Sequence, residues 1–476
     1  MLFSSLEFLL LFFPVTFGVN FILPAKLRNY WLLLASLFFY AWGEPRFVLV
    51  MMASICVNYF AALQMEQTDR KKRKKAFLIA DLILNLGLLF VFKYLNFLTG
   101  VVHDLLPGTK NLFPAATIEL PIGISFFTFQ AISYAVDVYR GNAQAQRNIG
   151  YVGLYISLFP QLIAGPIVRY TTVMDQIKDR TITVKSFSAG MLRFMTGFSK
   201  KILLANVLAE AADYAFGASG GSAGMAWLGA VCYSLQIYYD FSGYSDMAIG
   251  LGKMLGFHFL ENFDYPYISG TVTEFWRRWH ISLGTWFRDY VYIPLGGSHV
   301  RSRAKLIRNL LTVWILTGIW HGANWTFLLW GLLYGLVLIF EKLTDLPRKI
   351  QDAPKIARTA VRILALLVIL MGWVLFRSDR AGDAWIYLKA MFGANGNPLI
   401  GNDFLLYARE YAVYWIGGIL CALPIWKWIR EKTGIAGTRA ETVLTGTGQV
   451  FRLIFFAVSI TMLVMNAHNP FIYFNF

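Results

Sequence analysis

Charged residues and cysteines are scarce in this sequence. Only 15% of the 476 residues are charged and three are cysteines, whereas 57% are hydrophobic and 17% aromatic. Soluble domains rarely have this composition, so it argues against a soluble enzyme and indicates a polytopic membrane protein. Cys56, Cys232 and Cys421 lie in apolar surroundings without the spacing of metal ligands, and we expect them to be small buried side chains.

The sequence also lacks three patterns that would indicate another architecture. It has no linker between globular parts, no strand alternation of a membrane β-barrel, and no internal repeat of about 20 to 50 residues. An open sheet would leave unpaired backbone groups in lipid, so helices are the expected spanning elements. We therefore predict one all-α integral membrane domain over residues 1–476, with about eleven crossings.

Several apolar stretches are long enough to cross a membrane. A crossing of about 30 Å of hydrocarbon takes roughly 20 helical residues. Clear examples are Leu6–Leu23, Phe47–Met65, Ala76–Leu98, Ile363–Phe376 with its flanks, and Phe451–Met465. The first stretch lacks a basic leader and a small-residue cleavage site, so we expect a retained crossing and not a signal peptide.

The net charge of +16 is unevenly placed. Residues 70–75 are all basic and Lys200 and Lys201 belong to another basic cluster, whereas residues 216–224 carry no basic residue. Basic loops of membrane proteins stay in the cytoplasm, which predicts that the N- and C-termini both lie outside a bacterial inner membrane. These basic loops are expected to contact anionic lipid, and no nucleic acid partner is expected.

Residues 275–297 alternate aromatic and basic side chains too closely for a plain crossing, and a Pro-Leu-Gly-Gly sequence ends the segment. We expect an interfacial or re-entrant helix, with Arg277, Arg278 and Arg288 near the cytoplasmic phosphates. Such a surface either serves only orientation and lipid contact or also receives a phosphate-rich soluble molecule.

His321 stands inside a long apolar stretch. If Arg308 marks the cytoplasmic boundary, a helical rise of about 1.5 Å per residue places His321 roughly 20 Å deep. Residues 322–324 then form a turn in the hydrocarbon, which is tolerated only where protein buries it or where it lines a wet cavity. Ionisable groups at such depth are usually functional. The alternative is a packing histidine at a close helix crossing, helped by Gly318 and Gly322.

His280 is the natural companion of His321, because it is the other histidine in a dense aromatic and arginine setting. Two imidazoles without a carboxylate or thiolate cluster make an incomplete zinc ligand set, so we expect no metal. Imidazole titrates near neutral pH and can take a proton from a hydroxyl that attacks a carbonyl. General base catalysis is therefore the expected chemistry.

Five stretches occur in order along the chain: LPIGISFFTFQAISYAVDVYRG from residue 120, FPQLIAGPIVRY from 159, QIYYDFSGYSDMAIGLGKMLGF from 236, FWRRWHISLGTWFRDYVYIPLGG from 275 and TGIWHGANWTFLLWG from 317. Together they resemble the membrane-bound O-acyltransferase (MBOAT) superfamily, and specifically its bacterial AlgI-like branch, whose members acetylate alginate, peptidoglycan or cellulose or act in teichoic acid D-alanylation.

This resemblance implies a ring of tilted helices around a thin centre, with funnels open to both faces. It further implies that an acyl group, most simply acetyl, is taken from a cytoplasmic thioester and delivered to an extracytoplasmic polysaccharide such as alginate. Acetyl-CoA is the expected donor, and a carrier-protein thioester is the alternative. A separate periplasmic acetyltransferase that resembles SGNH hydrolases is the expected partner that completes the transfer.

The resemblance also assigns site residues. The essential histidine of the family, in its W-H-G context, falls on His321, and the second histidine, in its W-H-x-S context, falls on His280. We expect His321 to be the base, while His280 with Asn324 or Ser282 orients the carbonyl or stabilises developing charge.

Three further assignments stay open. Arg277 and Arg278 are candidates for contact with the phosphates of the donor. Asp240 and Asp246 belong either to the polar lining of the site or to helix caps and ion pairs. Residues 469–476 are either an interfacial aromatic tail or a relay in which Tyr473 accepts the acyl group as a phenyl ester, with His321 as its base.

Three classes of function remain in competition. They are an acyltransferase that serves a surface polysaccharide, a lipid-directed acyltransferase of the same superfamily, and a transporter or flippase with broken helices at the membrane midplane.

Overall fold

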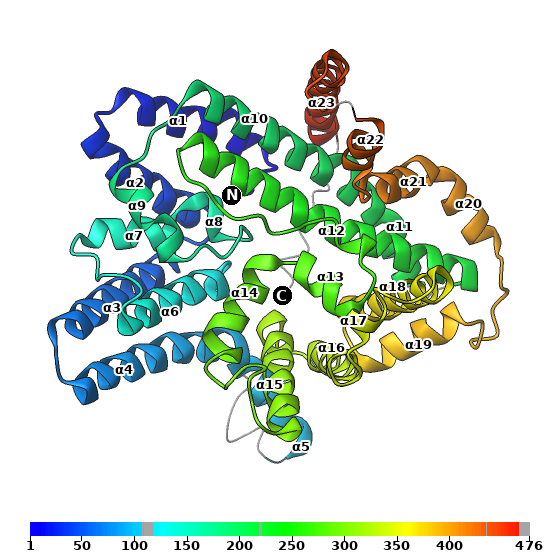
Figure 1. The fold of residues 1–476 in the computed structure, drawn as a ribbon, viewed down its shortest axis with the longest axis horizontal. Helices are drawn as coiled ribbons and strands as arrows, with labels where there is room; N and C mark the ends of the chain where they lie inside the picture. Colours follow the sequence, from blue (N-terminus) through cyan, green and yellow to red (C-terminus); the bar gives the residue numbers. More distant parts are fainter. Residues whose placement is uncertain (107, 109–117, 219–220, 435, 466–476) are drawn as a thin grey trace. The chain divides into compact units, whose positions relative to one another are not determined.

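A computed structural model of the chain describes residues 1–106, 108, 118–218, 221–434 and 436–465. Within these ranges the regular structure is helical and no β-strand occurs, which confirms the predicted all-α class. The chain forms two compact units, one of residues 1–194 and 247–260 and the other of residues 195–246 and 261–476 (Figure 1). Tyr473 and the aromatic tail lie outside the described residues.

The first unit is built mainly from the N-terminal helices (Figure 1). They are η1 (Phe8–Phe12), α1 (Phe13–Ile22), α2 (Ala25–Gly43), α3 (Val48–Gln67), α4 (Lys71–Leu89), η2 (Phe90–Tyr94), α5 (Leu95–Leu105), α6 (Ile124–Arg140), α7 (Ile149–Ser157), α8 (Phe159–Leu162) and α9 (Tyr170–Lys178). Helix α6 packs against α3 and α4, and α2 packs against α7. Gly123 and Gly141 adopt positive φ angles at the two ends of α6, where a side chain would be strained.

Two helices contribute residues to both units, α10 (Val184–Ser199) and α12 (Ala223–Met254). The remaining helices belong to the second unit. They are η4 (Lys200–Ala205), α11 (Asn206–Gly217), η5 (Pro266–Ile268), α13 (Val272–Arg278), α14 (Ile281–Phe287), η6 (Arg288–Tyr292), α15 (Arg303–His321), α16 (Trp325–Thr344), α17 (Leu346–Lys349), α18 (Lys355–Arg377), α19 (Ala381–Met391), α20 (Asn402–Glu410), α21 (Ala412–Cys421), α22 (Ile425–Thr433) and α23 (Arg439–Met465).

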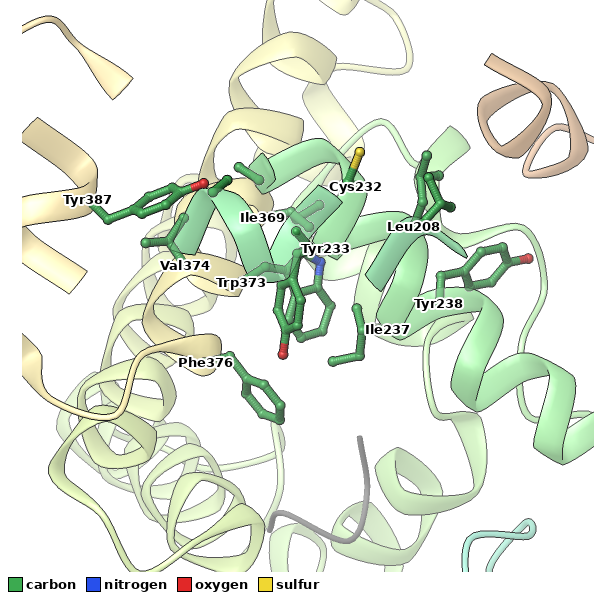
Figure 2. Packing of buried hydrophobic residues seen from close by; sticks show 14 of the residues in the cluster. Leu208, Cys232, Tyr233, Ile237, Tyr238, Ile369, Trp373, Val374, Phe376 and Tyr387 are labelled. Atoms are coloured by element: carbon green, nitrogen blue, oxygen red, sulfur yellow. The ribbon is translucent and has the colours of Figure 1, made fainter. Parts of the chain in front are cut away.

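The core of the second unit is aromatic. Side chains of α12 and α18, among them Tyr233, Trp373 and Phe376, pack together in Figure 2. Cys232 is buried in this cluster, as expected, whereas Cys56 and Cys421 are exposed. The prediction of buried thiols was wrong for those two, because an apolar surface that faces lipid needs no cover from protein.

Helices α15 and α16 form a close antiparallel hairpin. Helix α15 ends at His321 and α16 begins at Trp325, which confirms the predicted turn at residues 322–324. Gly318 and Gly331 lie at the crossing, where a Cβ on Gly318 would clash with the carbonyl oxygen of Phe327. Small residues therefore allow the two backbones to approach closely.

Five helices of the described chain are long and apolar enough to cross a membrane. They are Val48–Gln67, the continuous helix Lys71–Leu105, Trp325–Thr344, Lys355–Arg377 and Arg439–Met465. Helices α21 and α22, bent by 52°, add a sixth span if they are counted as one, while Phe8–Ile22 is a shorter apolar helix. The expectation of about eleven crossings therefore stays a prediction.

Candidate active site

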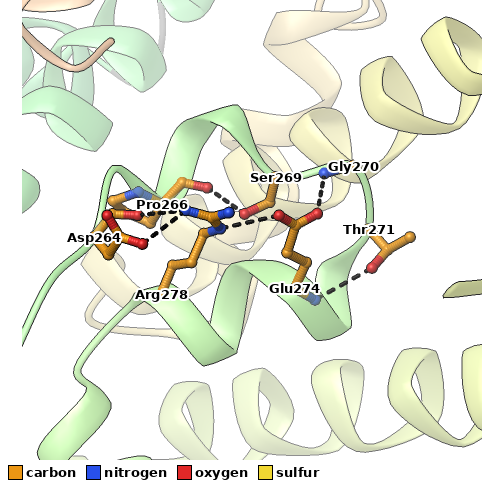
Figure 3. A network of polar contacts seen from close by, with 7 residues as sticks. All are labelled: Asp264, Pro266, Ser269, Gly270, Thr271, Glu274 and Arg278. Atoms are coloured by element: carbon orange, nitrogen blue, oxygen red, sulfur yellow. Dashed lines mark hydrogen bonds and ion pairs between the residues drawn. The ribbon is translucent and has the colours of Figure 1, made fainter. Parts of the chain in front are cut away.

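The short helix α13 leads into His280, and its N-terminus is tightly capped. The hydroxyl of Thr271 accepts a hydrogen bond from the backbone N–H of Glu274 at 3.2 Å, and the Glu274 carboxylate accepts one from Gly270 N–H at 2.8 Å (Figure 3). The carboxylate of Glu341, at the end of α16, accepts two more from the N–H groups of Val272 and Thr273, each at 2.8 Å. The N–H groups of Val272, Thr273 and Glu274 would otherwise be unpaired at the helix start.

The two arginines of α13 differ in their surroundings. Arg278 donates to the carboxylates of Asp264 and Glu274, each at 2.9 Å (Figure 3). Its guanidinium therefore braces α13 against the preceding loop. Arg277 is exposed and is the arginine better placed to meet a phosphate. The segment consists of three short helices, α13, α14 and η6, and ends where Gly296 and Gly297 adopt positive φ angles. Its predicted interfacial or re-entrant position stays a prediction.

His280 lies between α13 and α14 and is 3% exposed. Its Nδ1 atom is 3.2 Å from Oδ1 of Asn262, and the Ser282 hydroxyl donates to the same oxygen at 2.9 Å. The ring of Phe241 meets the imidazole edge to face, with centroids 4.6 Å apart. His280 lies outside the helices that could span a membrane. Its burial lowers the pKa of the imidazole to about 3, so the ring is neutral at physiological pH.

His321 is the last residue of α15 and is 7% exposed. Three aromatic rings enclose its imidazole, those of Trp320, Trp330 and Phe376, at centroid distances of 4.9, 5.0 and 5.1 Å. The ring of Trp320 also lies 6.0 Å from that of His280. Both predicted histidines therefore contact the same indole ring, that of Trp320.

The predicted orienting residues have clear structural roles. The Asn324 side chain caps α16 by accepting from Thr326 N–H at 3.2 Å, and its amide donates to the carbonyl of Asp379 at 2.7 Å. Asn324 thus fixes the turn that follows His321. Ser282 is joined to His280 through Asn262. A role of either residue toward a substrate stays a prediction.

The acidic residues of α12 form ion pairs with η4. Asp240 pairs with Lys201 at 2.6 Å and Asp246 with Lys200 at 2.7 Å. Gly243 lies between them on α12, and a Cβ there would lie 2.7 Å from the carbonyl oxygen of Gly197, so this glycine permits the close approach. The structure supports the ion-pair reading of the two aspartates.

Lys201 differs from the expectation that it belongs to a basic cluster at the cytoplasmic surface. Its side chain is 3% exposed and is paired with Asp240, so it is not a free basic residue at a membrane surface. The attraction between the two charges offsets part of the desolvation cost that would otherwise keep lysine in water.

Sequence reasoning missed Asn262 and Glu341, which reach His280 and α13 from distant positions. The T-x-x-E capping box at Thr271 and Glu274 was visible in the sequence. Within the described part of the chain, no group of three or more His, Cys, Asp or Glu side chains could hold a metal ion.

Known proteins resemble this chain along its whole length. The profile of the MBOAT, membrane-bound O-acyltransferase family, matches residues 148–376. The chain is 39% identical to a protein of Azotobacter vinelandii named probable alginate O-acetylase AlgI, over 504 residues and 100% of both chains. It is 43% identical over 394 residues to the protein of the same name from Pseudomonas aeruginosa, which covers 82% of this chain and 75% of that one. It is 37% identical over 436 residues to the peptidoglycan O-acetyltransferase of Helicobacter pylori, with 84% and 81% covered.

The chain therefore belongs to the membrane-bound O-acyltransferase family and is a multi-pass membrane protein. Within that family it is an O-acetyltransferase.

Proposed function

We propose that this O-acetyltransferase takes an acetyl group from a cytoplasmic thioester, acetyl-CoA, and passes it across the inner membrane for O-acetylation of an extracytoplasmic polysaccharide such as alginate. The observation that carries this acceptor class is the similarity, over 100% of both chains, to a protein named for alginate O-acetylation. Peptidoglycan is the second candidate acceptor, favoured by the relative from Helicobacter pylori.

His321 is the proposed base. As the hydroxyl oxygen attacks the thioester carbon, His321 takes the hydroxyl proton, the new C–O bond forms, and the C–S bond breaks. The proton then passes to the departing thiolate. Two observations support this role: aromatic rings enclose the imidazole, and its place at the C-terminus of α15 favours the positive charge that the base gains.

The exposed Arg277 is the proposed contact for the donor's phosphates. Both termini are proposed to lie outside the inner membrane. An SGNH-hydrolase-like acetyltransferase outside the membrane is the proposed partner that receives the acetyl group and transfers it to the polymer.

Tyr473 is the proposed relay between the base and this partner. A phenol is a weak nucleophile until a base removes its proton, and His321 would supply that base. Tyr473→Phe removes the hydroxyl and keeps the ring, so we expect loss of polymer acetylation at an unchanged amount of protein. Wild-type acetylation in this variant would refute the relay.

Feeding labelled acetate to cells that make or lack the protein tests the function. We expect label that depends on the protein in the extracted surface polysaccharide. Label confined to lipid would favour the lipid-directed acyltransferase, and label confined to peptidoglycan would favour the second acceptor. Unchanged label in every fraction would refute acetyl transfer and favour a transporter.

A further inference from the structure

Asn262 is a buried residue that organises the surroundings of His280. It is 1% exposed, and its Oδ1 atom accepts hydrogen bonds from the backbone N–H of Ser282 at 3.1 Å and from the Ser282 hydroxyl at 2.9 Å. Its Nδ2 atom donates to Oγ of Ser245 at 3.1 Å. Because a backbone N–H can only donate, the atom that faces it must be the oxygen, so hydrogen-bonding chemistry fixes the orientation of the amide.

This orientation determines where His280 carries its proton. The Nδ1 atom of His280 lies 3.2 Å from Asn262 Oδ1, which has lone pairs and no hydrogen. A hydrogen bond between them therefore requires a proton on Nδ1. The other tautomer would oppose two lone pairs at this distance and gain only a contact of 3.5 Å with Ser282 Oγ. The neutral imidazole thus has its lone pair on Nε2.

The Nε2 atom of His280 is buried and has no hydrogen-bond partner among the described residues. The backbone of His280 also adopts a φ of 45°, in the left-handed region. Such a conformation is strained in a residue other than glycine and persists where the surroundings enforce it. A strained residue with an unsatisfied acceptor is typical of a site that a ligand completes.

We propose that Asn262 is a positioning residue that holds His280 in the Nδ1–H tautomer, so that Nε2 accepts a hydrogen bond from an O–H or N–H group of a bound reactant. This differs from the role expected from sequence, in which His280 donates toward developing negative charge, because neutral Nε2 has no proton to donate. No proton is transferred at His280, since the proton of the attacking hydroxyl goes to His321. The proposal deepens the proposed acetyl transfer and rests on it for its activity readout.

Most charged groups of the elements around His280 form ion pairs, whereas Arg277 on α13 is exposed. The pairs are Asp240 with Lys201, Asp246 with Lys200, and Arg278 with Asp264 and Glu274. The groups that face Nδ1 are Asn262 Oδ1 at 3.2 Å and Ser282 Oγ at 3.5 Å. His321 is a further titratable group near His280, since both imidazoles contact the ring of Trp320.

Nitrogen NMR of the full-length protein labelled with ¹⁵N-histidine tests the tautomer without any activity. The sequence has six histidines, and the His280→Asn variant assigns the signal by its loss. We expect His280 to show a protonated Nδ1 and an unprotonated Nε2. A protonated Nε2 would overturn the proposal, and this result would leave the proposed function untouched.

The Asn262→Asp variant tests the consequence for catalysis. Its carboxylate still faces Nδ1, and the Ser245 hydroxyl can turn to donate to the second oxygen. The added negative charge favours the imidazolium form, which places a proton on Nε2 and blocks an acceptor. We expect the ratio of the transfer rate at about pH 6 to that at about pH 8 to fall roughly fivefold relative to the wild type.

Two other outcomes would overturn the proposal. A rise of this ratio would show that His280 works as a donor, and an equal loss at every pH would show that Asn262 has only a structural role. Asn397→Asp is the matched control, because Asn397 is exposed and the same charge is added away from His280. Absence of transfer by the wild type at any pH would contradict the proposed function instead.

Discussion

The ammonium group of Lys201 lies 2.6 Å from the carboxylate of Asp240, and each side chain is 3% exposed. This pair joins η4 to α12 at a π-helical turn, and it lies one residue from Phe241, which packs on His280. Charges this deeply buried are stable only together, because each alone would keep its full desolvation cost. The pair therefore holds η4 against the part of α12 that packs on His280.

Removing one partner of this pair should destabilise the protein strongly. We expect Lys201→Met to cost about 3–5 kcal/mol, and we expect the double variant Lys201→Met with Asp240→Leu to recover much of that loss. Thermal unfolding in detergent measures both. Arg377→Met is the control, because its pair with Asp213 is much more exposed, and such pairs contribute about 0–1 kcal/mol. Equal destabilisation by the single and double variants would contradict this account.

The glycines of the α15–α16 hairpin should not tolerate side chains. In Gly318→Ala the new Cβ meets the carbonyl oxygen of Phe327, a backbone atom that cannot turn away. We expect a cost of about 1–3 kcal/mol and a displaced His321, hence slower transfer. Gly417→Ala is the matched control, since a Cβ there has no neighbour within 4 Å. Unchanged stability and activity in Gly318→Ala would show that the α15–α16 crossing can accommodate a methyl group, which would contradict this prediction.

Substitution of the two arginines of α13 should have different effects, one on binding of the thioester donor and the other on stability. Arg277→Gln removes an exposed charge, so we expect a higher KM for the thioester donor at unchanged stability. Arg278→Gln breaks contacts with two carboxylates, so we expect lower thermal stability first. Steady-state kinetics with acetyl-CoA, together with unfolding curves, distinguish them. An unchanged KM in Arg277→Gln would refute its contact with the donor.

The sequence predicted local features well. The break between α15 and α16 follows from His321, Gly322 and the helix-capping Asn324, which lie within four consecutive residues of the chain. Long apolar helices such as α18 were visible because composition alone reveals them.

Contacts between distant segments were not predictable. Asn262 forms a hydrogen bond with His280, 18 residues away in the sequence, and Glu341 forms one with Val272, 69 residues away. No local sequence pattern links these residues. In the sequence, Lys201 looked like a basic loop residue that sets membrane orientation. Its ion pair with Asp240 of α12 depends on tertiary packing and has no local sequence signal. The acyl relay at Tyr473 lies outside the described residues and stays a prediction.

The most direct test of the central claim is acetyl transfer by His321→Ala in membranes that contain equal amounts of each variant. With labelled acetyl-CoA on the cytoplasmic side, we expect the rate of label transfer to the outside acceptor to fall about 10²–10⁴-fold. His299→Ala, which changes an exposed histidine of the same unit, should transfer at the wild-type rate. Wild-type transfer by His321→Ala would contradict the assignment of His321 as the base.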